Sequence, residues 1–283
     1  MTLGQLRTRV SESLKAITDE WETETQQLIC GLLGVSRLDL VLERHKAISE
    51  QEAALVFRAV ERRLKREPLQ YILGTQGFMG LEFIVGPGVL IPRHDTEVLV
   101  AYAVSTLSAL KNPYVLDIGT GSGAIILSLL KELKGARGLA LDISAEALTI
   151  AKQNAQRFKL NERVTFRESD IFSEMQAAER LSFDLIISNP PYIPAGDKAT
   201  LQREITDYEP ENALYGGEDG LVFYRQIIPN AKDYLKSGGW LMFEAGHDQA
   251  PAVETLLRQC NYENVSHFND LRGVSRFIIG RKQ

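Results

Sequence analysis

The segment Tyr114-Val115-Leu116-Asp117-Ile118-Gly119-Thr120-Gly121-Ser122-Gly123 decides the fold of this chain. An apolar run of strand length leads directly into glycines with the spacing G-x-G-x-G, and a helical pattern follows over 123–133. Glycines let the backbone turn tightly and approach a ligand closely, and the start of a helix presents unpaired N–H groups. A strand, a glycine-rich turn and a helix in this order predict the first unit of a doubly wound sheet with a ligand at its edge.

Apolar runs of strand length recur after this segment and alternate with helical patterns. The strands are expected at 138–142, 164–168, 183–188 and 240–244, and the helices at 145–158 and about 221–235. This alternation predicts an α/β, Rossmann-like domain with a mostly parallel sheet and helices on both faces. The final runs, 264–268 and 276–279, have too short a connection for a crossover helix, so we expect an antiparallel end to the sheet.

The chain before this sheet has a different pattern. Apolar residues from Leu3 to Ile17 have helical spacing, and Ser49-Glu50-Gln51-Glu52 resembles a capping box that opens another helix. From Tyr71 glycines interrupt short apolar stretches, which is typical of a hairpin or an extended linker. We therefore predict a helical domain over 1–70, a β-hairpin linker over 71–94 and the α/β domain over 95–283.

The composition limits the class of function. The chain has 283 residues, with 32 basic and 37 acidic side chains, a net charge of −5 and 44% hydrophobic residues. A mildly acidic chain is not typical of a nucleic-acid binder. The N-terminus lacks the apolar core of a signal peptide, no run is long enough to span a bilayer, and Cys30 and Cys260 have no paired spacing. We therefore expect a cytoplasmic protein with reduced thiols. The histidines have no ligand-like spacing, so we expect no metal site.

Acidic residues follow the next two predicted strands. A carboxylate at Asp142 can accept the ribose hydroxyl protons of a nucleoside. A carboxylate at Asp170 can accept from an adenine amine while Ile171 packs on the ring. Each motif alone also fits a tight turn or a helix cap, but together on consecutive strands they fit an adenosyl group across the sheet edge. The glycine spacing resembles the S-adenosylmethionine loop of class I methyltransferases.

The fourth predicted strand ends in Asn189-Pro190-Pro191-Tyr192. Because prolines have no N–H, this loop offers almost only acceptors and suits a planar NH2 group. We expect the Asn189 side-chain oxygen and the Pro190 carbonyl to accept both N–H bonds of that group, and Tyr192 to stack on its plane. This arrangement would direct the nitrogen lone pair at a sulfonium methyl group, without a strong general base. The loop alone does not distinguish an amide from the exocyclic amine of a base, and it also fits a rigid turn.

Further motifs resemble a single family over nearly the whole chain. They are Pro68-Leu69-Gln70-Tyr71-Ile72-Leu73-Gly74, Phe78-x-Gly80-Leu81-x-Phe83, Gly88-Val89-Leu90-Ile91-Pro92-Arg93, Glu209-Pro210, Asp219-Gly220-Leu221 and Asp270-Leu271-x-Gly273-x-x-Arg276. With the glycine loop and the Asn-Pro-Pro-Tyr loop, they resemble the PrmC/HemK protein-(glutamine-N5) methyltransferases. The resemblance implies a helical bundle that recognises the substrate, a β-hairpin linker and a class I S-adenosylmethionine-dependent methyltransferase domain. It also implies a substrate, the glutamine of the Gly-Gly-Gln motif in peptide chain release factors, and a role in translation termination.

The same resemblance assigns roles to residues. It implies that S-adenosyl-L-methionine, which leaves as S-adenosyl-L-homocysteine, is bound by Gly119, Thr120, Gly121, Ser122, Gly123, Asp142, Ile171 and Asn189. It implies that the substrate glutamine is held by Asn189, Pro190, Pro191 and Tyr192, of which Asn189, Pro190 and Tyr192 are catalytic. The sequence departs from the family at His94, Asp95 and Ile171, where relatives usually have Pro and Glu and often an aromatic residue, respectively.

Other functions compete with this interpretation. An amino methyltransferase for adenine or guanine in nucleic acid has the same acceptor loop, but the net charge of −5 argues against it. A methyltransferase for a glutamine of a ribosomal protein is disfavoured by Asp95-Thr96-Glu97, and an adenosyl-binding regulatory module by the intact acceptor loop. We expect a monomer whose partner is a release factor, with no direct nucleic-acid or membrane contact, and we hypothesise that the N-terminal bundle contacts the release-factor body.

Overall fold

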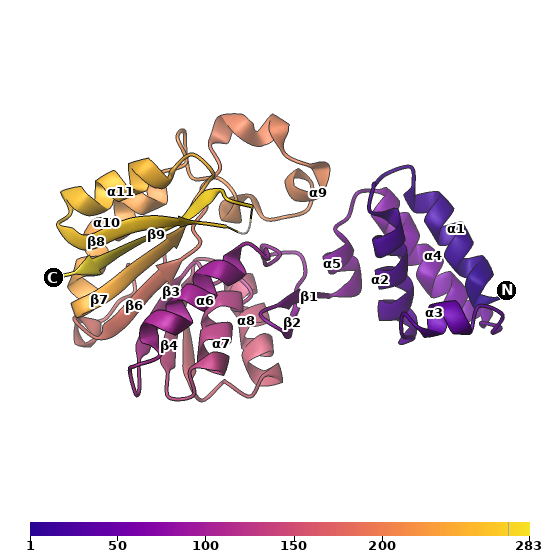
Figure 1. Ribbon diagram of the computed structural model, residues 1–283, viewed down its shortest axis with the longest axis horizontal. Helices are drawn as coiled ribbons and strands as arrows, with labels where there is room; N and C mark the ends of the chain where they lie inside the picture. Colours follow the sequence, from indigo (N-terminus) through magenta and orange to yellow (C-terminus); the bar gives the residue numbers. More distant parts are fainter. Residues whose placement is uncertain (271) are drawn as a thin grey trace. The chain divides into compact units, whose positions relative to one another are not determined.

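The computed structural model describes residues 1–270 and 272–283 (Figure 1). Leu271, which belongs to the closing motif Asp270-Leu271-x-Gly273, lies outside the described residues. The contacts divide the chain into two compact units. Unit 1 contains Met1–Thr75 and Gln202–Tyr208, and unit 2 contains Gln76–Leu201 and Glu209–Gln283.

Unit 1 is helical, as the spacing of its apolar residues predicts. Ser49 caps α4 in the capping box expected from the sequence, because its hydroxyl accepts from the Glu52 N–H and the Glu52 carboxylate accepts from the Ser49 N–H. Leucines, valines and isoleucines from α1, α2 and α4 form the core of this unit. Its helices are α1 (Leu3–Leu14), α2 (Trp21–Leu33), α3 (Asp39–Leu42), α4 (Glu50–Leu64), α5 (Leu69–Leu73) and α9 (Arg203–Thr206).

A buried guanidinium explains why a segment from late in the sequence belongs to unit 1. Arg63 on α4 donates to both carboxylate oxygens of Glu24, at 2.7 and 3.0 Å, and to Glu204 on α9 at 2.9 Å. Arg66 also donates to Glu204, at 3.3 Å. Arg63 is 5% exposed, so its charge depends on these carboxylates in place of water.

Unit 2 contains a seven-stranded sheet with the order β5-β4-β3-β6-β7-β9-β8. The pairs from β5 to β7 are parallel, and β9 pairs antiparallel with both β7 and β8, which confirms the predicted mostly parallel sheet with an antiparallel end. The strands are β3 (Tyr114–Ile118), β4 (Arg137–Asp142), β5 (Val164–Glu168), β6 (Phe183–Ser188), β7 (Leu235–Glu244), β8 (Tyr262–Asn269) and β9 (Ser275–Lys282). β7 begins at Leu235, before the predicted start at 240, because extra residues of β7 bulge out between its pairs with β6, Phe183 with Leu235 and Leu185 with Trp240.

Helices cover both faces of this sheet (Figure 1). One face carries α6 (Thr96–Leu107), α7 (Ala124–Glu132) and α8 (Ala145–Arg157), and the other carries α10 (Val222–Tyr234) and α11 (Ala250–Gln259). A hairpin of β1 (Thr75–Phe78) and β2 (Leu81–Ile84) precedes α6, and its Phe78 and Phe83 join the core on the α6 face. Short 3-10 turns lie at Ala177–Glu179, Ala195–Thr200 and Glu211–Ala213. Within 1–270 and 272–283, no helix has the length and apolarity needed to cross a bilayer.

Candidate active site

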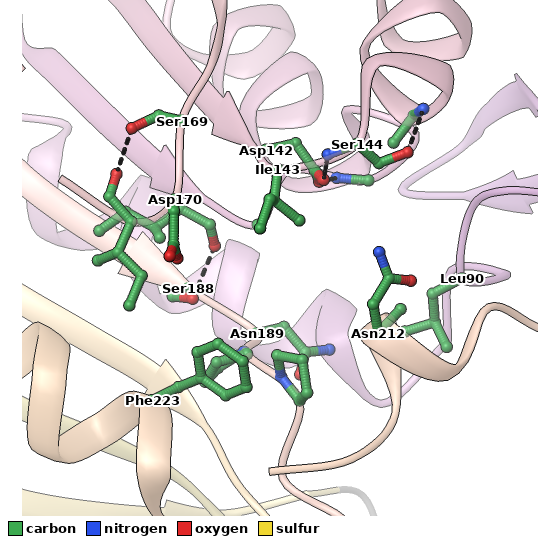
Figure 2. Close-up of a pocket in the computed structure, with 18 of the residues that line it drawn as sticks. Leu90, Asp142, Ile143, Ser144, Ser169, Asp170, Ser188, Asn189, Asn212 and Phe223 are labelled. Atoms are coloured by element: carbon green, nitrogen blue, oxygen red, sulfur yellow. Dashed lines mark hydrogen bonds between the residues drawn. The ribbon is translucent and has the colours of Figure 1, made fainter. Parts of the chain in front are cut away.

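A cavity of about 390 Å³ lies at the carboxyl ends of the parallel strands. Its walls include Gly119 after β3, Asp142 at the end of β4, Asp170 after β5 and Asn189 after β6. In Figure 2, Asp142 and Asp170 lie across the cavity from Asn189. β3 and β6 are neighbours although β4 and β5 come between them in the sequence, so the cavity lies at the topological switch point, where ligands bind in open α/β sheets. Its volume suits a small molecule.

The glycine loop is left-handed at each of its glycines. The φ angles are +71° at Gly119, +55° at Gly121 and +80° at Gly123, and residues other than glycine rarely adopt this backbone conformation. Nothing lies within 4 Å of the position that a Cβ atom would take at Gly119 or Gly121, and both residues line the cavity. The loop therefore leaves open space beside its backbone, which fits the close approach of a ligand.

Asp142 holds the glycine loop in place. Its two oxygens accept from the backbone N–H of Gly121 at 2.8 Å and of Ser144 at 2.9 Å. Burial raises the pKa of this carboxyl above its ordinary value. The Ser144 side chain, and not Asp142, caps α8, so Asp142 has its predicted place on the cavity wall without the alternative role of helix cap.

Asp117 is a polar residue for which sequence reasoning gave no role. It lies in the apolar run of β3 and is fully buried, with Oδ2 accepting from the Thr120 hydroxyl at 2.7 Å and Oδ1 without a partner. Burial raises the pKa of its carboxyl to about 7. Asp117 is not among the residues that line the cavity, and its hydrogen bond to Thr120 connects it to the glycine loop. An acidic residue inside an apolar strand was the available signal.

Ile171 lines the cavity in a strained backbone conformation. Its φ is +51°, which is an outlier for a β-branched residue. The Ser169 hydroxyl donates to the Ile171 carbonyl at 3.0 Å and helps to hold this turn. Strain of this kind gathers at ligand sites, because the surrounding structure must hold it. Asp170 and Ile171 both stand on the cavity wall, where the sequence predicts adenine.

The acceptor loop divides between the cavity and the core. Asn189, Pro190 and Pro191 line the main cavity, and Asn189 also lines a second hollow of about 50 Å³ that Thr120 and Ser122 share. Tyr192 lines neither of these two cavities. It packs against the core beside α10, its carbonyl accepts from Gln249 Nε2 at 2.8 Å, and burial raises its pKa to about 12. Stacking of Tyr192 on the substrate stays a prediction.

The tertiary structure adds residues that sequence reasoning did not place at the site. Leu90 comes from the segment before α6, Asn212 from the turn Glu211–Ala213 and Phe223 from α10, and Figure 2 shows all of them around the cavity. Tyr215 also lines it and has a buried hydroxyl without a partner. These residues belong to or adjoin the motifs that carry the family resemblance, and that proximity was the only signal in the sequence.

Carboxylates connect the linker motif to the rest of unit 2. Glu209 accepts from the backbone N–H of Ile91 at 3.1 Å and from Arg93 at 2.5 Å, so two separate sequence motifs meet. Asp95, one of the departures from the family pattern, pairs with Arg272 at 2.6 Å. These contacts hold residues 91–95 beside the hollow that Pro92 and Arg93 line.

Comparisons with known proteins agree with this architecture. A family model described as the PrmC N-terminal domain matches residues 5–74, and one described as a methyltransferase domain matches residues 110–274. A release factor glutamine methyltransferase from Geobacter sulfurreducens is 45% identical over 91% of this chain and 88% of its own length. Another, from Koribacter versatilis, is 37% identical over 100% of this chain and 99% of its own.

Solved structures confirm the predicted class I methyltransferase fold. The catalytic domain of hMettl16, in complex with the MAT2A 3'UTR hairpin 6, has a TM-score of 0.59 at 17% identity, over 83% of this chain and 82% of that one. A methyltransferase from Pyrococcus furiosus has a TM-score of 0.52 at 19% identity, over 83% of this chain and 99% of that one. Identities this low show a common fold alone.

Proposed function

The chain belongs to the release factor glutamine methyltransferase family, and from this premise we propose that it methylates the side-chain amide nitrogen, N5, of the glutamine in the Gly-Gly-Gln motif of release factors. It is a methyltransferase that uses S-adenosyl-L-methionine, and its reaction modulates translation termination. The observation that carries the proposal is that the acceptor loop and the glycine loop line one cavity. Asn189 and Pro190 line the same cavity as the glycine loop and Asp142, which brings acceptors for an NH2 group beside a nucleoside site.

The residues of the cavity fit the methyl donor. The open space beside Gly119 and Gly121 accommodates the close approach of the ligand. Asp142 is the acceptor for ribose hydroxyls, and Ile171 is the apolar neighbour of adenine. When bound, S-adenosyl-L-methionine supplies an electrophilic methyl group on a sulfonium sulfur and leaves as S-adenosyl-L-homocysteine.

The chain's own contribution is orientation of a weak nucleophile. An amide nitrogen shares its lone pair with the carbonyl, the same resonance that gives a rotation barrier of about 18–20 kcal/mol. Asn189 Oδ1 and the Pro190 carbonyl accept the two N–H bonds of the glutamine, which fixes the nitrogen and stabilises the positive charge that develops on it. The proton leaves to water after methyl transfer, so the site needs no strong general base.

Unit 1 is the proposed recognition domain for the release-factor body. Its family model is distinct from that of the methyltransferase domain, and nucleoside binding involves unit 2 residues alone. Removing the residues before Pro68 should raise the KM for intact release factor by more than the Kd for cofactor. Unchanged kinetics on intact release factor after this truncation would contradict the proposal.

Mass spectrometry tests the function directly. Incubating the chain with cofactor and purified release factor should add one methyl group to the peptide that contains Gly-Gly-Gln, and Asn189→Ala should add none. Parallel incubations with labelled cofactor should leave ribosomal proteins, RNA and DNA unlabelled. Label that appears only in nucleic acid, or only in a ribosomal protein, would replace the proposed substrate.

A further inference from the structure

A buried chain of polar side chains adjoins Asn189. Thr96, the first residue of α6, donates its hydroxyl proton to Glu244 Oε2 at 2.6 Å. Asn189 Nδ2 in turn donates to Thr96 Oγ1 at 3.4 Å. Thr96 is 4% exposed and Glu244, at the end of β7, is 2% exposed. Thr96 and Glu244 are absent from the predicted site, and the proposed methyl transfer assigns no role to either of them.

The order of donors and acceptors along these hydrogen bonds determines which end of the Asn189 amide faces Thr96. A hydroxyl has one proton, and Thr96 gives that proton to Glu244. An ionised carboxylate cannot donate one back, so the Thr96 oxygen can only accept from its other neighbour. Asn189 must therefore present its NH2 group to Thr96. Its Oδ1 is then the end left for a ligand in the cavity that Asn189 lines.

We propose that Glu244, acting through Thr96, is a positioning residue that holds Asn189 with its carbonyl oxygen toward the substrate amide. The inference rests on the proposed function, because an acceptor is required there only when the substrate presents an NH2 group. If the Asn189 amide turned over, its NH2 group would face the NH2 group of the glutamine, and one of the two hydrogen bonds that orient the nucleophile would be lost.

The groups around Glu244 make its protonation state sensitive to pH near neutrality. Burial raises the pKa of its carboxyl to about 7, against lowering effects of Thr96, of Arg276 and of the Asn189 amide, and with a further raising effect of Asp95. The Tyr224 hydroxyl donates to the Glu244 backbone carbonyl at 2.8 Å, and the phenol of Tyr192 also lies within its electrostatic influence. When Glu244 is protonated it becomes able to donate to Thr96, which frees the Thr96 proton for Asn189 and removes the constraint on the amide. The kcat of methyl transfer should therefore rise with pH through about 7.

A matched pair of substitutions at Thr96 tests the hydrogen bonds that connect Glu244 to Asn189 through Thr96. Thr96→Val keeps the shape and removes the hydroxyl, whereas Thr96→Ser keeps the hydroxyl. We expect Thr96→Val to lower the kcat for release-factor methylation roughly tenfold or more, because it releases the orientation of Asn189. Thr96→Ser should stay within about threefold of the wild type, and both variants should bind S-adenosyl-L-methionine within about twofold of the wild type by calorimetry. A Thr96→Val enzyme within twofold of the wild-type kcat, or a serine variant as slow as the valine variant, would overturn the proposal.

The pH profile separates positioning from a merely structural role. Glu244→Gln keeps the size of the side chain but removes its titration, so its kcat should be flat between about pH 6 and 8 while that of the wild type rises. A wild-type profile that is equally flat, or a rise that persists in Glu244→Gln, would contradict the role of Glu244.

Hydrogen exchange of the Asn189 side chain provides a test of the proposal that needs no substrate. In protein with 15N-labelled asparagine, the NH2 signal of Asn189 is identified by its loss in Asn189→Ala. Its protons should exchange slowly in the wild type and faster in Thr96→Val. Equal exchange in the two proteins overturns the proposal. Absence of methyl transfer by the wild type would instead remove the proposed function, and the exchange comparison would then decide the orientation of Asn189 by itself.

Discussion

Replacing Asn154 by alanine should destabilise unit 2 through a defined set of lost hydrogen bonds. Asn154 is a fully buried residue of α8. Its Oδ1 accepts from the Ile84 N–H at 2.7 Å, and its Nδ2 donates to the Ile84 carbonyl at 3.0 Å and to the Ser122 carbonyl at 2.9 Å. One side chain thus connects the end of the hairpin to the glycine loop, and alanine leaves these backbone groups unpaired.

The expected loss follows from the burial of the groups left behind. Ile84 is half-buried, so water replaces part of its lost bonds and about 1 kcal/mol is expected for each of them. Ser122 is buried, and its unpaired carbonyl adds about 1–2 kcal/mol. The total, about 3–4 kcal/mol, corresponds to a Tm lower by about 10 °C for a domain of this size.

Differential scanning calorimetry of the full chain provides the measurement. Gln153→Ala is the matched control, because Gln153 is the exposed neighbour on the same helix and its loss should change the free energy of unfolding by less than about 0.5 kcal/mol. Cofactor affinity should also fall in Asn154→Ala, since Ser122 belongs to the glycine loop. A Tm for Asn154→Ala within about 2 °C of the control would refute the assignment of these bonds as stabilising.

Further substitutions test the site and the core. Asn189→Ala should abolish methyl transfer, measured with labelled cofactor, while circular dichroism stays unchanged; near-normal turnover would remove the acceptor role. Asp142→Ala should raise the cofactor Kd in calorimetry roughly tenfold or more, because it releases the Gly121 N–H as well as the ribose acceptor; an unchanged Kd would contradict this. Arg63→Ala should lower the free energy of unfolding of unit 1 in urea by about 3–5 kcal/mol, since it leaves the Glu24 carboxylate buried without its partner; a change below about 1 kcal/mol would refute this. The pKa of Glu244 is raised from 4.5 to about 7, so the folded chain keeps a proton that the unfolded chain loses, and the associated stability is complete below pH 4.5 and is lost by about pH 7. The free energy of unfolding should fall by about 3 kcal/mol over this range. Urea unfolding at pH 5 and pH 8 should show a smaller fall in this free energy for Glu244→Gln than for the wild type.

Local patterns in the sequence predicted the elements that local physics controls. The capping box at Ser49, the strand and turn at 114–123 and the antiparallel end of the sheet depend on side-chain spacing, glycine backbone freedom and connection length, all of which are legible in one stretch of chain. The start of β7 was missed because Lys236-Ser237-Gly238-Gly239 lacks the apolar pattern of a strand, and pairing with β6 overrides that composition.

The polar connections of the core were outside the reach of the sequence. Asp117 and Glu244 read only as exceptions inside apolar strands, and nothing nearby in the chain indicates their partners. Thr96 and Glu244 are separated by 148 positions, and Arg63 and Glu204 by 141. Their contacts exist only because the order of strands and helices brings the ends of distant elements together.

The sequence by itself determined the class of fold and predicted which residues follow the strand ends, because periodicity, glycine conformation and the missing N–H of proline are properties of short segments. Only the tertiary structure decided that Tyr192 packs against the core, that residues 202–208 join unit 1 and that Asn189 lies beside Thr96. The physical reason is that the direction of a hydrogen bond depends on which donors and acceptors meet, and burial makes that meeting obligatory.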